Sequence, residues 1–250
     1  MVMVKTIGII GGDGHFGRHA RRLIRRFASK VKVCAFDVTK KANGGVFTTL
    51  EQVCMCDVVV LSVPPRAYEN VIREIVPIIK RLNPLAIIVD IATVKEHTRN
   101  LLRQYAEGIF WLCCHPNFGP GAYKNRRGNV RGFKIALVDH SMPADVVASL
   151  LMFVKRLGFV VELMTAEEHD RISAWTLYLA HRTSQIWKAA GVQRTTFDTT
   201  SFSSMKDGAE MVEEDTDLFN DVRRYNRFCA EVDVALARAE AQVLQSRSAE

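Results

Sequence analysis

The stretch TIGIIGGDGHFGRHA, residues 6–20, decides the fold of the amino-terminal half of the chain. An apolar run of strand length comes first, a glycine-rich turn follows, and the pattern after the turn is helical. Gly12 permits a tight bend, Gly14 lets the backbone approach a phosphate group, and Gly17 lets helix and strand pack closely. Free backbone amides at the helix start bind phosphate, so this order predicts a dinucleotide site. Its expected residues are Gly12, Asp13, Gly14, His15, Phe16 and Gly17.

The residues that end the next apolar runs bear on the choice of nucleotide. Asp37 follows the run at 31–36, and a carboxylate there accepts hydrogen bonds from ribose hydroxyls and repels a 2′-phosphate. The sequence therefore predicts NAD as cofactor, with NADP possible because two lysines lie close by. Ser62, Val63 and Pro64 end a later run and are expected to line the nicotinamide half of the site, because ligands lie beyond the carboxyl ends of parallel strands. Pro64 is equally compatible with a simple strand stop.

Short apolar runs alternate with helical patterns through the first two thirds of the chain. The runs span residues 6–10, 31–36, 57–63, 86–91, 109–114, 134–138 and 160–164. The helical patterns span residues 17–28, 67–81, 95–105 and 143–157. Most runs are continuously apolar, which is typical of parallel strands buried on both faces. The alternation predicts an α/β fold with a Rossmann-type, doubly wound, mostly parallel sheet.

The pattern changes after residue 164, so we expect a dinucleotide-binding domain at 1–164 and a smaller all-α domain at 165–250. Thr165 and Glu168 form a capping box, which predicts a long helix ending near Gly191. After a Thr/Ser-rich loop, apolar residues from 218 to 243 recur at three- and four-residue spacing and predict one further long helix. Two long helices can bury only a small amount of apolar surface against each other. We therefore expect a homodimer formed through this helical domain.

Composition limits the class of protein. The chain has 250 residues, of which 48% are hydrophobic and 24% charged, as is typical of globular proteins. No apolar run approaches the roughly 18 residues of a membrane span, and no signal peptide is evident, which predicts a cytoplasmic protein without a membrane partner. The net charge is +7, but no nucleic-acid-binding motif accompanies it. We therefore expect anionic small molecules rather than nucleic acid as partners. The six cysteines lack zinc-ligand spacing, so no metal site is expected.

Polar residues follow two further apolar runs. One segment reads Asp90-Ile-Ala-Thr93-Val-Lys95, and the other begins at His115 and reads His-Pro-Asn-Phe-Gly-Pro. A histidine at the carboxyl edge of a sheet is well placed to act as a general base, because its ordinary pKa near 6.5 lets it take a proton at neutral pH. Spacing alone leaves a structural role for His115 equally open.

The order of these motifs resembles the prephenate/arogenate dehydrogenase family. Its members show the glycine turn, then Asp-x-x-Ser-Val-Lys and His-Pro-Met-x-Gly-Pro. They next show Glu-His-Asp before a helix that bears another histidine, and finally Asp-x-x-Leu-Phe/Tyr. This chain has the corresponding segments at residues 90–95, 115–120, 168–170 with His181, and 215–219. The resemblance covers about residues 5–228 and is closest to plant-type arogenate enzymes over 161–226.

The resemblance implies NAD(P)-dependent oxidative decarboxylation of arogenate or prephenate, which are cyclohexadienyl acids of tyrosine biosynthesis. It makes His115 the general base, with Thr93, which stands where the family has serine, and His181 as further catalytic candidates. Asp170 and His181 are eleven residues apart, about three helical turns, so they are expected to share a face with Ser184. An acid at Asp170 would suit the amino group of arogenate. The expected substrate-binding residues are Asp170, Asn117, Ser184 and Arg182.

One departure from the family pattern keeps alternatives open. Many prephenate-using relatives carry an arginine five residues before Asp-x-x-Leu, where this chain has Glu210. Either Arg182 or Arg194 replaces that cation, or the substrate is another cyclohexadienyl acid such as 4-amino-4-deoxyprephenate. A β-hydroxyacid dehydrogenase would need Lys188 or Lys206 as its catalytic lysine. A non-catalytic NAD-binding regulator is the alternative from another class.

Overall fold

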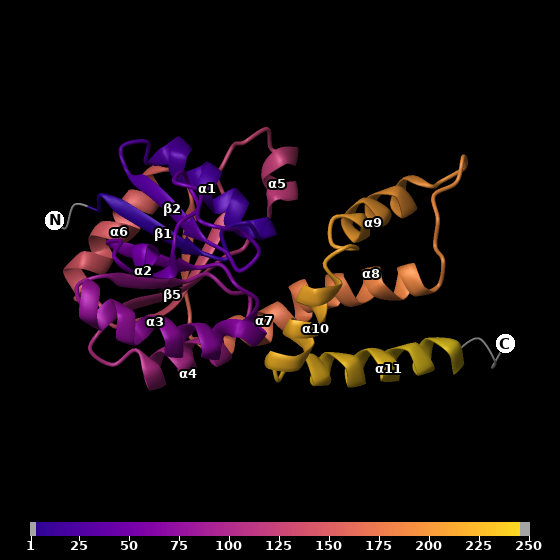
Figure 1. The fold of residues 1–250 in the computed structure, drawn as a ribbon. Helices are drawn as coiled ribbons and strands as arrows, with labels where there is room; N and C mark the ends of the chain where they lie inside the picture. Colours follow the sequence, from indigo (N-terminus) through magenta and orange to yellow (C-terminus); the bar gives the residue numbers. More distant parts are fainter. Residues whose placement is uncertain (1–3, 246–250) are drawn as a thin grey trace. The chain divides into compact units, whose positions relative to one another are not determined.

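The structure is a computed structural model that describes residues 4–245. The chain divides into two compact units, Met1–His169 and Asp170–Glu250. Figure 1 colours them along the sequence, from indigo to yellow. The outer ends of the two domains expected from the sequence, residues 1–3 and 246–250, lie outside the described residues. No helix in the described part of the chain is long and apolar enough to cross a membrane.

The first unit is built on a seven-stranded sheet with the order β2-β1-β3-β4-β5-β6-β7. The strands are β1 (Thr6–Ile10), β2 (Lys32–Phe36), β3 (Val58–Leu61), β4 (Ile87–Asp90), β5 (Phe110–Pro116), β6 (Lys134–His140) and β7 (Val160–Leu163). All neighbours pair in parallel except β5 and β6, which are antiparallel. The expected Rossmann-type, mostly parallel sheet is therefore confirmed.

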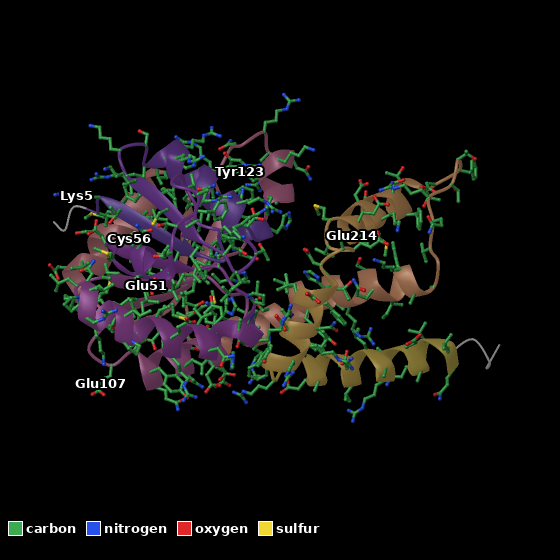
Figure 2. The ribbon with its side chains drawn as sticks, in the orientation of Figure 1. Lys5, Glu51, Cys56, Glu107, Tyr123 and Glu214 are labelled. Atoms are coloured by element: carbon green, nitrogen blue, oxygen red, sulfur yellow. The ribbon has the colours of Figure 1, made fainter. Side chains whose placement is uncertain are left out.

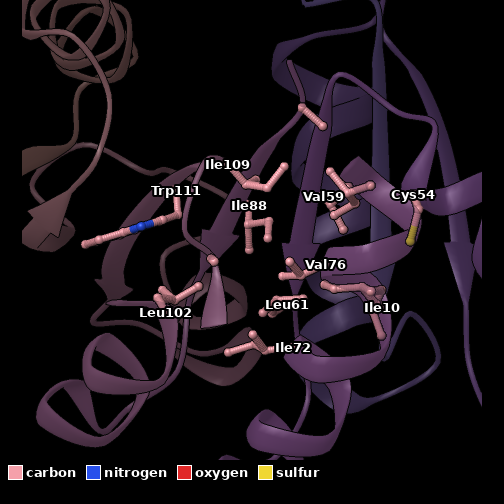
Figure 3. Packing of buried hydrophobic residues seen from close by; sticks show 14 of the residues in the cluster. Ile10, Cys54, Val59, Leu61, Ile72, Val76, Ile88, Leu102, Ile109 and Trp111 are labelled. Carbon is pink, nitrogen blue, oxygen red and sulfur yellow. The ribbon is translucent and has the colours of Figure 1, made fainter. Parts of the chain in front are cut away.

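Helices cover both faces of this sheet. They are α1 (His15–Phe27), α2 (Leu50–Cys54), η1 (Pro65–Ala67), α3 (Tyr68–Leu82), α4 (Lys95–Tyr105), α5 (Pro120–Asn125) and α6 (Ala144–Arg156). The largest hydrophobic cluster joins α2, α3 and α4 to one face, with Ile72, Ile88 and Leu102 among its members (Figure 3). Smaller clusters join α1 and α6 to the other face. The sequence did not predict α2 or α5, because five and six residues are too few to show a helical period.

The glycine turn brings α1 close to β1. A Cβ atom on Gly17 would lie 2.1 Å from the backbone oxygen of Gly11, and one on Gly12 would lie 2.5 Å from the Cβ of Ala35. Neither position has room for a side chain. The close packing of helix and strand predicted for Gly17 is thus present, and Gly12, where a tight bend was predicted, is equally crowded. This packing holds the start of α1 beside the carboxyl end of the sheet.

The second unit is helical. Its elements are the end of α7 (Ala166–Ser173), the π-helical segment η2 (Ala174–Tyr178), α8 (Leu179–Ala189), α9 (Thr200–Glu210), α10 (Thr216–Tyr225) and α11 (Cys229–Gln245). Stacked aromatic pairs lie in its interior, such as Tyr178 on Phe219, with ring centroids 5.5 Å apart. The expected all-α segment after the sheet is therefore confirmed, although three of its details were wrong.

The first error concerns the helix after residue 165. Its capping box is present, since the Thr165 hydroxyl accepts from the backbone N–H of Glu168 and the Glu168 carboxylate accepts from that of Thr165. However, η2 interrupts the helix before it ends ahead of Gly191, which has a φ of +69°. A π-helical turn holds more residues than an α-helical turn. Asp170 and His181 were expected on one face because an unbroken α-helix was assumed between them. With η2 between them, their spacing of eleven residues no longer supports a shared face.

The other two errors concern the chain after Gly191. The Thr/Ser-rich loop contains α9, where the Thr199 hydroxyl caps the helix by accepting from the N–H of Phe202. The expected single helix at 218–243 is instead two, α10 and α11, because the chain leaves helical geometry at Asn226. The Asn226 carboxamide donates to the Asp170 carbonyl and accepts from the N–H of Phe228, which stabilises the break.

Candidate active site

A buried carboxylate organises the carboxyl edge of the first unit. Asp90, the last residue of β4, is fully buried and forms a 2.6 Å ion pair with the equally buried Lys95. The carboxylate also accepts hydrogen bonds from the hydroxyls of Tyr68 and Thr98, each within 2.8 Å. Burial opposes the charge on Lys95, but Asp90 outweighs it and raises the pKa of the ammonium. The Lys95 ammonium is therefore charged, and its ion pair with Asp90 locks the loop between β4 and α4.

Lys95 connects this cluster to the next strand. Its ammonium donates to the carbonyl of Cys114, 2.7 Å away, and Cys114 directly precedes His115 on β5. His115 is almost completely buried, and its Nδ1 lies 2.9 Å from Nε2 of His169, which is also buried. Burial is the main cause that lowers the pKa of His115 well below 6.5, with His169 and Lys95 adding to the effect. The imidazole is therefore neutral at pH 7 and able to accept a proton.

Thr93 lies in the same loop, between Asp90 and Lys95. Its hydroxyl oxygen is buried and has no hydrogen-bond partner among the residues that the structure describes. A buried hydroxyl without a partner costs about 1–3 kcal/mol. The orphaned hydroxyl fits a ligand group that completes its hydrogen bonding.

The nucleotide end of the edge is arranged around Asp37. One carboxylate oxygen accepts from the backbone N–H of Asp13, and the other accepts from the N–H and hydroxyl of Thr39. Burial alone would raise the pKa of Asp37, but the hydrogen bonds from Thr39, Asp13 and Gly14 outweigh it and lower the pKa. Asp37 is therefore an anion fixed beside the glycine turn. Lys40 forms a 3.3 Å ion pair with Asp13, so its charge is partly neutralised.

The remaining residues expected in the first unit lie in loops at the same edge. Ser62 follows β3 and donates its backbone N–H to the Ile10 carbonyl, which fixes the segment of Ser62, Val63 and Pro64 beside the glycine turn. Asn117 is exposed just after β5, and its backbone N–H bonds to the Lys134 carbonyl. His15 is exposed and Phe16 half-buried at the start of α1.

Of the residues expected in the second unit, Asp170, His181 and Ser184 are buried and Arg182 is half-buried. The Ser184 hydroxyl donates to the carbonyl of Ala209, and Arg182 forms a 2.8 Å ion pair with Asp233. Asp170 is fully buried. His181 is also buried, and its Nδ1 has no hydrogen-bond partner among residues 4–245. Burial is the main cause that lowers the pKa of His181, against the pull of Asp215.

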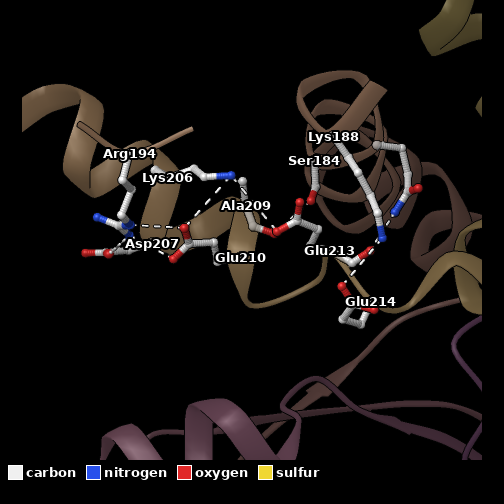
Figure 4. Close-up of polar contacts among 10 residues, drawn as sticks. Ser184, Lys188, Arg194, Lys206, Asp207, Ala209, Glu210, Glu213 and Glu214 are labelled. Carbon is white, nitrogen blue, oxygen red and sulfur yellow. Dashed lines mark hydrogen bonds and ion pairs between the residues drawn. The ribbon is translucent and has the colours of Figure 1, made fainter. Parts of the chain in front are cut away.

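The position of the missing arginine carries a local ion-pair cluster (Figure 4). Arg194 binds both oxygens of Glu210, at 3.0 and 2.9 Å, and also pairs with Asp207. Lys206 is nearly buried and lies 3.9 Å from Glu210. Both cations proposed as replacements, Arg182 and Arg194, are thus paired with carboxylates of the second unit.

Sequence reasoning missed one residue of this site. His169 was noticed only as the middle of a Glu-His-Asp motif, yet its ring contacts His115, 54 positions earlier. The motif itself was the available signal, because a histidine beside a capping glutamate has no role in the cap. Among the described residues no cluster of three or more His, Cys, Asp or Glu could hold a metal ion.

Comparison with known proteins identifies the family. The profile of the nucleotide-binding domain of prephenate dehydrogenase matches residues 24–163, which is more than half of the chain. The chain belongs to the prephenate dehydrogenase family. The matched range begins within α1 and ends at the last residue of β7.

Three similar proteins agree with this family. Over 195 residues the chain is 28% identical to chloroplastic arogenate dehydrogenase 1 of Arabidopsis thaliana, covering 74% of this chain and 30% of that one. It is 27% identical over 184 residues to a probable arogenate/prephenate dehydrogenase of Methanocaldococcus jannaschii, covering 70% and 40%. The chain thus spans well under half the length of these two relatives. A crystal structure of Aquifex aeolicus prephenate dehydrogenase with hydroxyphenyl propionate and NAD+ shares the fold, with a TM-score of 0.69, 18% identity and coverage of 99% and 93%.

Proposed function

We propose that the chain is an NAD-dependent dehydrogenase that oxidatively decarboxylates arogenate or prephenate, with His115 as general base. The observation that carries the proposal is the buried contact between His115 Nδ1 and His169 Nε2 at the carboxyl edge of a dinucleotide-binding sheet. A neutral imidazole held at that edge is suited to remove a proton from a ligand bound there. The family membership supports the same reaction class.

The cofactor fits the residues present. The turn at Gly12, Gly14 and Gly17 leaves no side chain between the backbone and a diphosphate, and the fixed Asp37 anion favours NAD over NADP. Bound at this turn, NAD would supply the hydride acceptor for the oxidation of the ring carbon of the substrate. The hydroxyl of Thr93 is then available to hydrogen-bond the base, the substrate hydroxyl or the nicotinamide.

The histidine pair determines which nitrogen is basic. For Nε2 of His115 to take the proton of the substrate hydroxyl, Nδ1 must carry a hydrogen and donate it to Nε2 of His169. His169 therefore positions the base and fixes its tautomer, while Lys95 holds the preceding carbonyl. After proton and hydride leave, the ring carboxylate departs as carbon dioxide because the ring becomes aromatic. A positioned base of this kind contributes about 10²–10⁴-fold to the rate.

Substrate recognition is proposed for Asp170, Ser184, Arg182 and Asn117, and His181 is proposed as a further catalytic residue. A buried Asp170 would suit the amino group of arogenate better than the keto group of prephenate. The Arg194–Glu210 pairing described above favours an amino-bearing acid over prephenate, since no unpaired cation stands at the position of the usual arginine. The same observation keeps 4-amino-4-deoxyprephenate as the second candidate substrate.

We also propose a homodimer and a cytoplasmic location. In the second unit α11 exposes Val234, Val243 and Leu244, apolar side chains that a second copy of the chain would cover. Light scattering coupled to size-exclusion chromatography tests the dimer: a monomeric mass at micromolar concentration would exclude it.

The test of the proposed function is NADH formation with arogenate and prephenate side by side. Wild type should turn over arogenate faster than prephenate, and His115→Asn should lose about 10²–10⁴-fold in kcat while its thermal transition stays unchanged. NAD binding without turnover of either acid would refute the proposal and favour a non-catalytic regulator. Turnover that survives the substitution would refute the role of His115 alone.

A further inference from the structure

A groove of about 570 Å³ lies in the first unit between α1 and α5. Its size falls in the range of small-molecule sites. Residues that line it include His15, His19, Arg22, Tyr123, Lys124 and Arg127. The first three come from one face of α1, at spacings of four and three residues, and the others from α5 and the turn after it.

The charged side chains that line the groove are all positive. Arg22, Lys124 and Arg127 are exposed, and none of them forms an ion pair with any residue that the structure describes. No described acidic residue lines the groove. By contrast, Arg18 on the same helix lies 3.6 Å from the carboxylate of Asp13. Three uncompensated cations around one concave surface attract a multiply charged anion.

A buried, unpartnered nitrogen adds a second observation. His19 is only 2% exposed, and its Nε2 has no hydrogen-bond partner among residues 4–245. Edge-on contacts fix its ring against Phe16, Phe118 and Tyr123, with centroids 5.0–5.9 Å away. Burial first, then Arg22 and His15, lower the pKa of His19 to about 4. The ring is thus neutral at pH 7, and its unpartnered nitrogen needs a ligand atom to complete its hydrogen bonding.

Side-chain contacts hold α1 and α5, which form the two walls of the groove, in place without a ligand. The Arg26 guanidinium on α1 donates to the hydroxyl of Tyr123 on α5, 2.6 Å away, and Figure 2 labels Tyr123 at this place. Phe118, just before α5, stacks on Phe133 with centroids 4.6 Å apart. A preformed site loses less conformational entropy on binding.

We propose that this groove binds a diphosphate group, held by Arg22, Lys124 and Arg127. Guanidinium forks match phosphate oxygens in geometry, and an added ammonium suits a ligand with several negative charges. The ligand proposed is a separate phosphorylated metabolite, because the diphosphate of the dinucleotide is already assigned to the turn at Gly12, Gly14 and Gly17. The proposal does not depend on the dehydrogenase reaction.

Calorimetric titration of the full chain with inorganic pyrophosphate tests the proposal. The variant Lys124→Ala/Arg127→Ala should bind pyrophosphate at least about tenfold more weakly than wild type. The matched control Arg25→Ala/Lys30→Ala removes the same charge from exposed positions of the first unit outside the groove, and should change affinity less than about twofold. Equal losses in both variants, or no binding to wild type, would overturn the proposal. Circular dichroism checks that both variants are folded.

A second titration at saturating NAD separates the groove from the dinucleotide site. Binding of pyrophosphate that persists and stays sensitive to Lys124→Ala/Arg127→Ala would support the proposal. Loss of pyrophosphate binding would overturn it, because the anion would then occupy the diphosphate site of the dinucleotide. A chain that binds pyrophosphate in the groove yet turns over no cyclohexadienyl acid would refute the proposed function and leave this inference standing.

Discussion

Replacing Lys95 with methionine isolates the contribution of the buried ion pair beneath the candidate base. Both partners of the pair have no exposed side-chain surface, and the nitrogen and oxygen lie 2.6 Å apart. Removing one partner leaves an uncompensated buried charge on Asp90, which costs about 3–5 kcal/mol of the free energy of unfolding. Methionine also cannot replace the hydrogen bond to the Cys114 carbonyl. Lys95→Met should therefore lose about 3–5 kcal/mol in urea denaturation.

Two further variants make this result specific. Asp90→Asn/Lys95→Met removes both charges and should recover at least about 1–2 kcal/mol of the loss, because no isolated charge stays buried. Lys134→Met breaks an exposed ion pair with Glu162 and should cost no more than about 1 kcal/mol. If Lys95→Met costs no more than Lys134→Met, or if the double variant is less stable than the single one, the ion-pair reasoning is wrong.

Three other outcomes follow from the site and its surroundings. His169→Ala removes a neighbour that lowers the pKa of His115, so the acid limb of the kcat/KM profile should move up toward pH 6.5 and kcat should fall. The same change leaves Nδ1 of the buried His115 without its partner and should cost about 1–3 kcal/mol of the free energy of unfolding. Gly17→Ala should abolish NAD binding and destabilise the first unit by more than about 2 kcal/mol, because the new Cβ would overlap a backbone oxygen of the turn. The control Gly119→Ala should bind NAD as wild type does, because its Cβ would meet nothing within 4 Å. His19 has a folded pKa of about 4, below its unfolded value near 6.5, so its contribution is fully present above pH 6.5 and is lost as the pH falls toward 4. His19→Gln should flatten that decline by at most about 3 kcal/mol in denaturation at several pH values; an unchanged slope would contradict the assignment.

Most of the fold of the first unit could be predicted from local sequence patterns. The glycine turn, the apolar runs and the helical periods are all visible within short windows, and all seven strands occur at the predicted places. The placement of Asp90 and Thr93 at the end of β4, and of His115 near the end of β5, followed from the same logic, because the carboxyl ends of neighbouring parallel strands meet at one edge. These features depend only on sequence periodicity and on the geometry of parallel sheets.

Features that depend on contacts between distant parts of the chain could not be predicted from the sequence. The motif around His169 marks the residue, but it does not show that the ring reaches His115, because that contact depends on how the chain returns after β7. The break between α10 and α11 was hidden since apolar residues keep their helical spacing through it. What ends α10 is a hydrogen bond from Asn226 to the carbonyl of Asp170, which lies 56 residues earlier in the chain. A helix break of this kind depends on a tertiary contact and does not change the spacing of apolar residues in the sequence.

The π-helical segment η2 gives the second unit a tolerance to insertion and deletion that an unbroken helix lacks. Its wide turn holds one residue more than the α-helical path needs, and the Thr176 hydroxyl bonds to the Ile172 carbonyl within the disturbed ladder. Deleting one residue between 174 and 178 would close the wide turn into an α-helical one and leave the residues after it in nearly their present orientation. His181 would keep its direction, which a one-residue deletion in a continuous α-helix would change by about 100°. Among relatives, gaps of one residue at this place would therefore mark a point where the helix can change length without being reoriented.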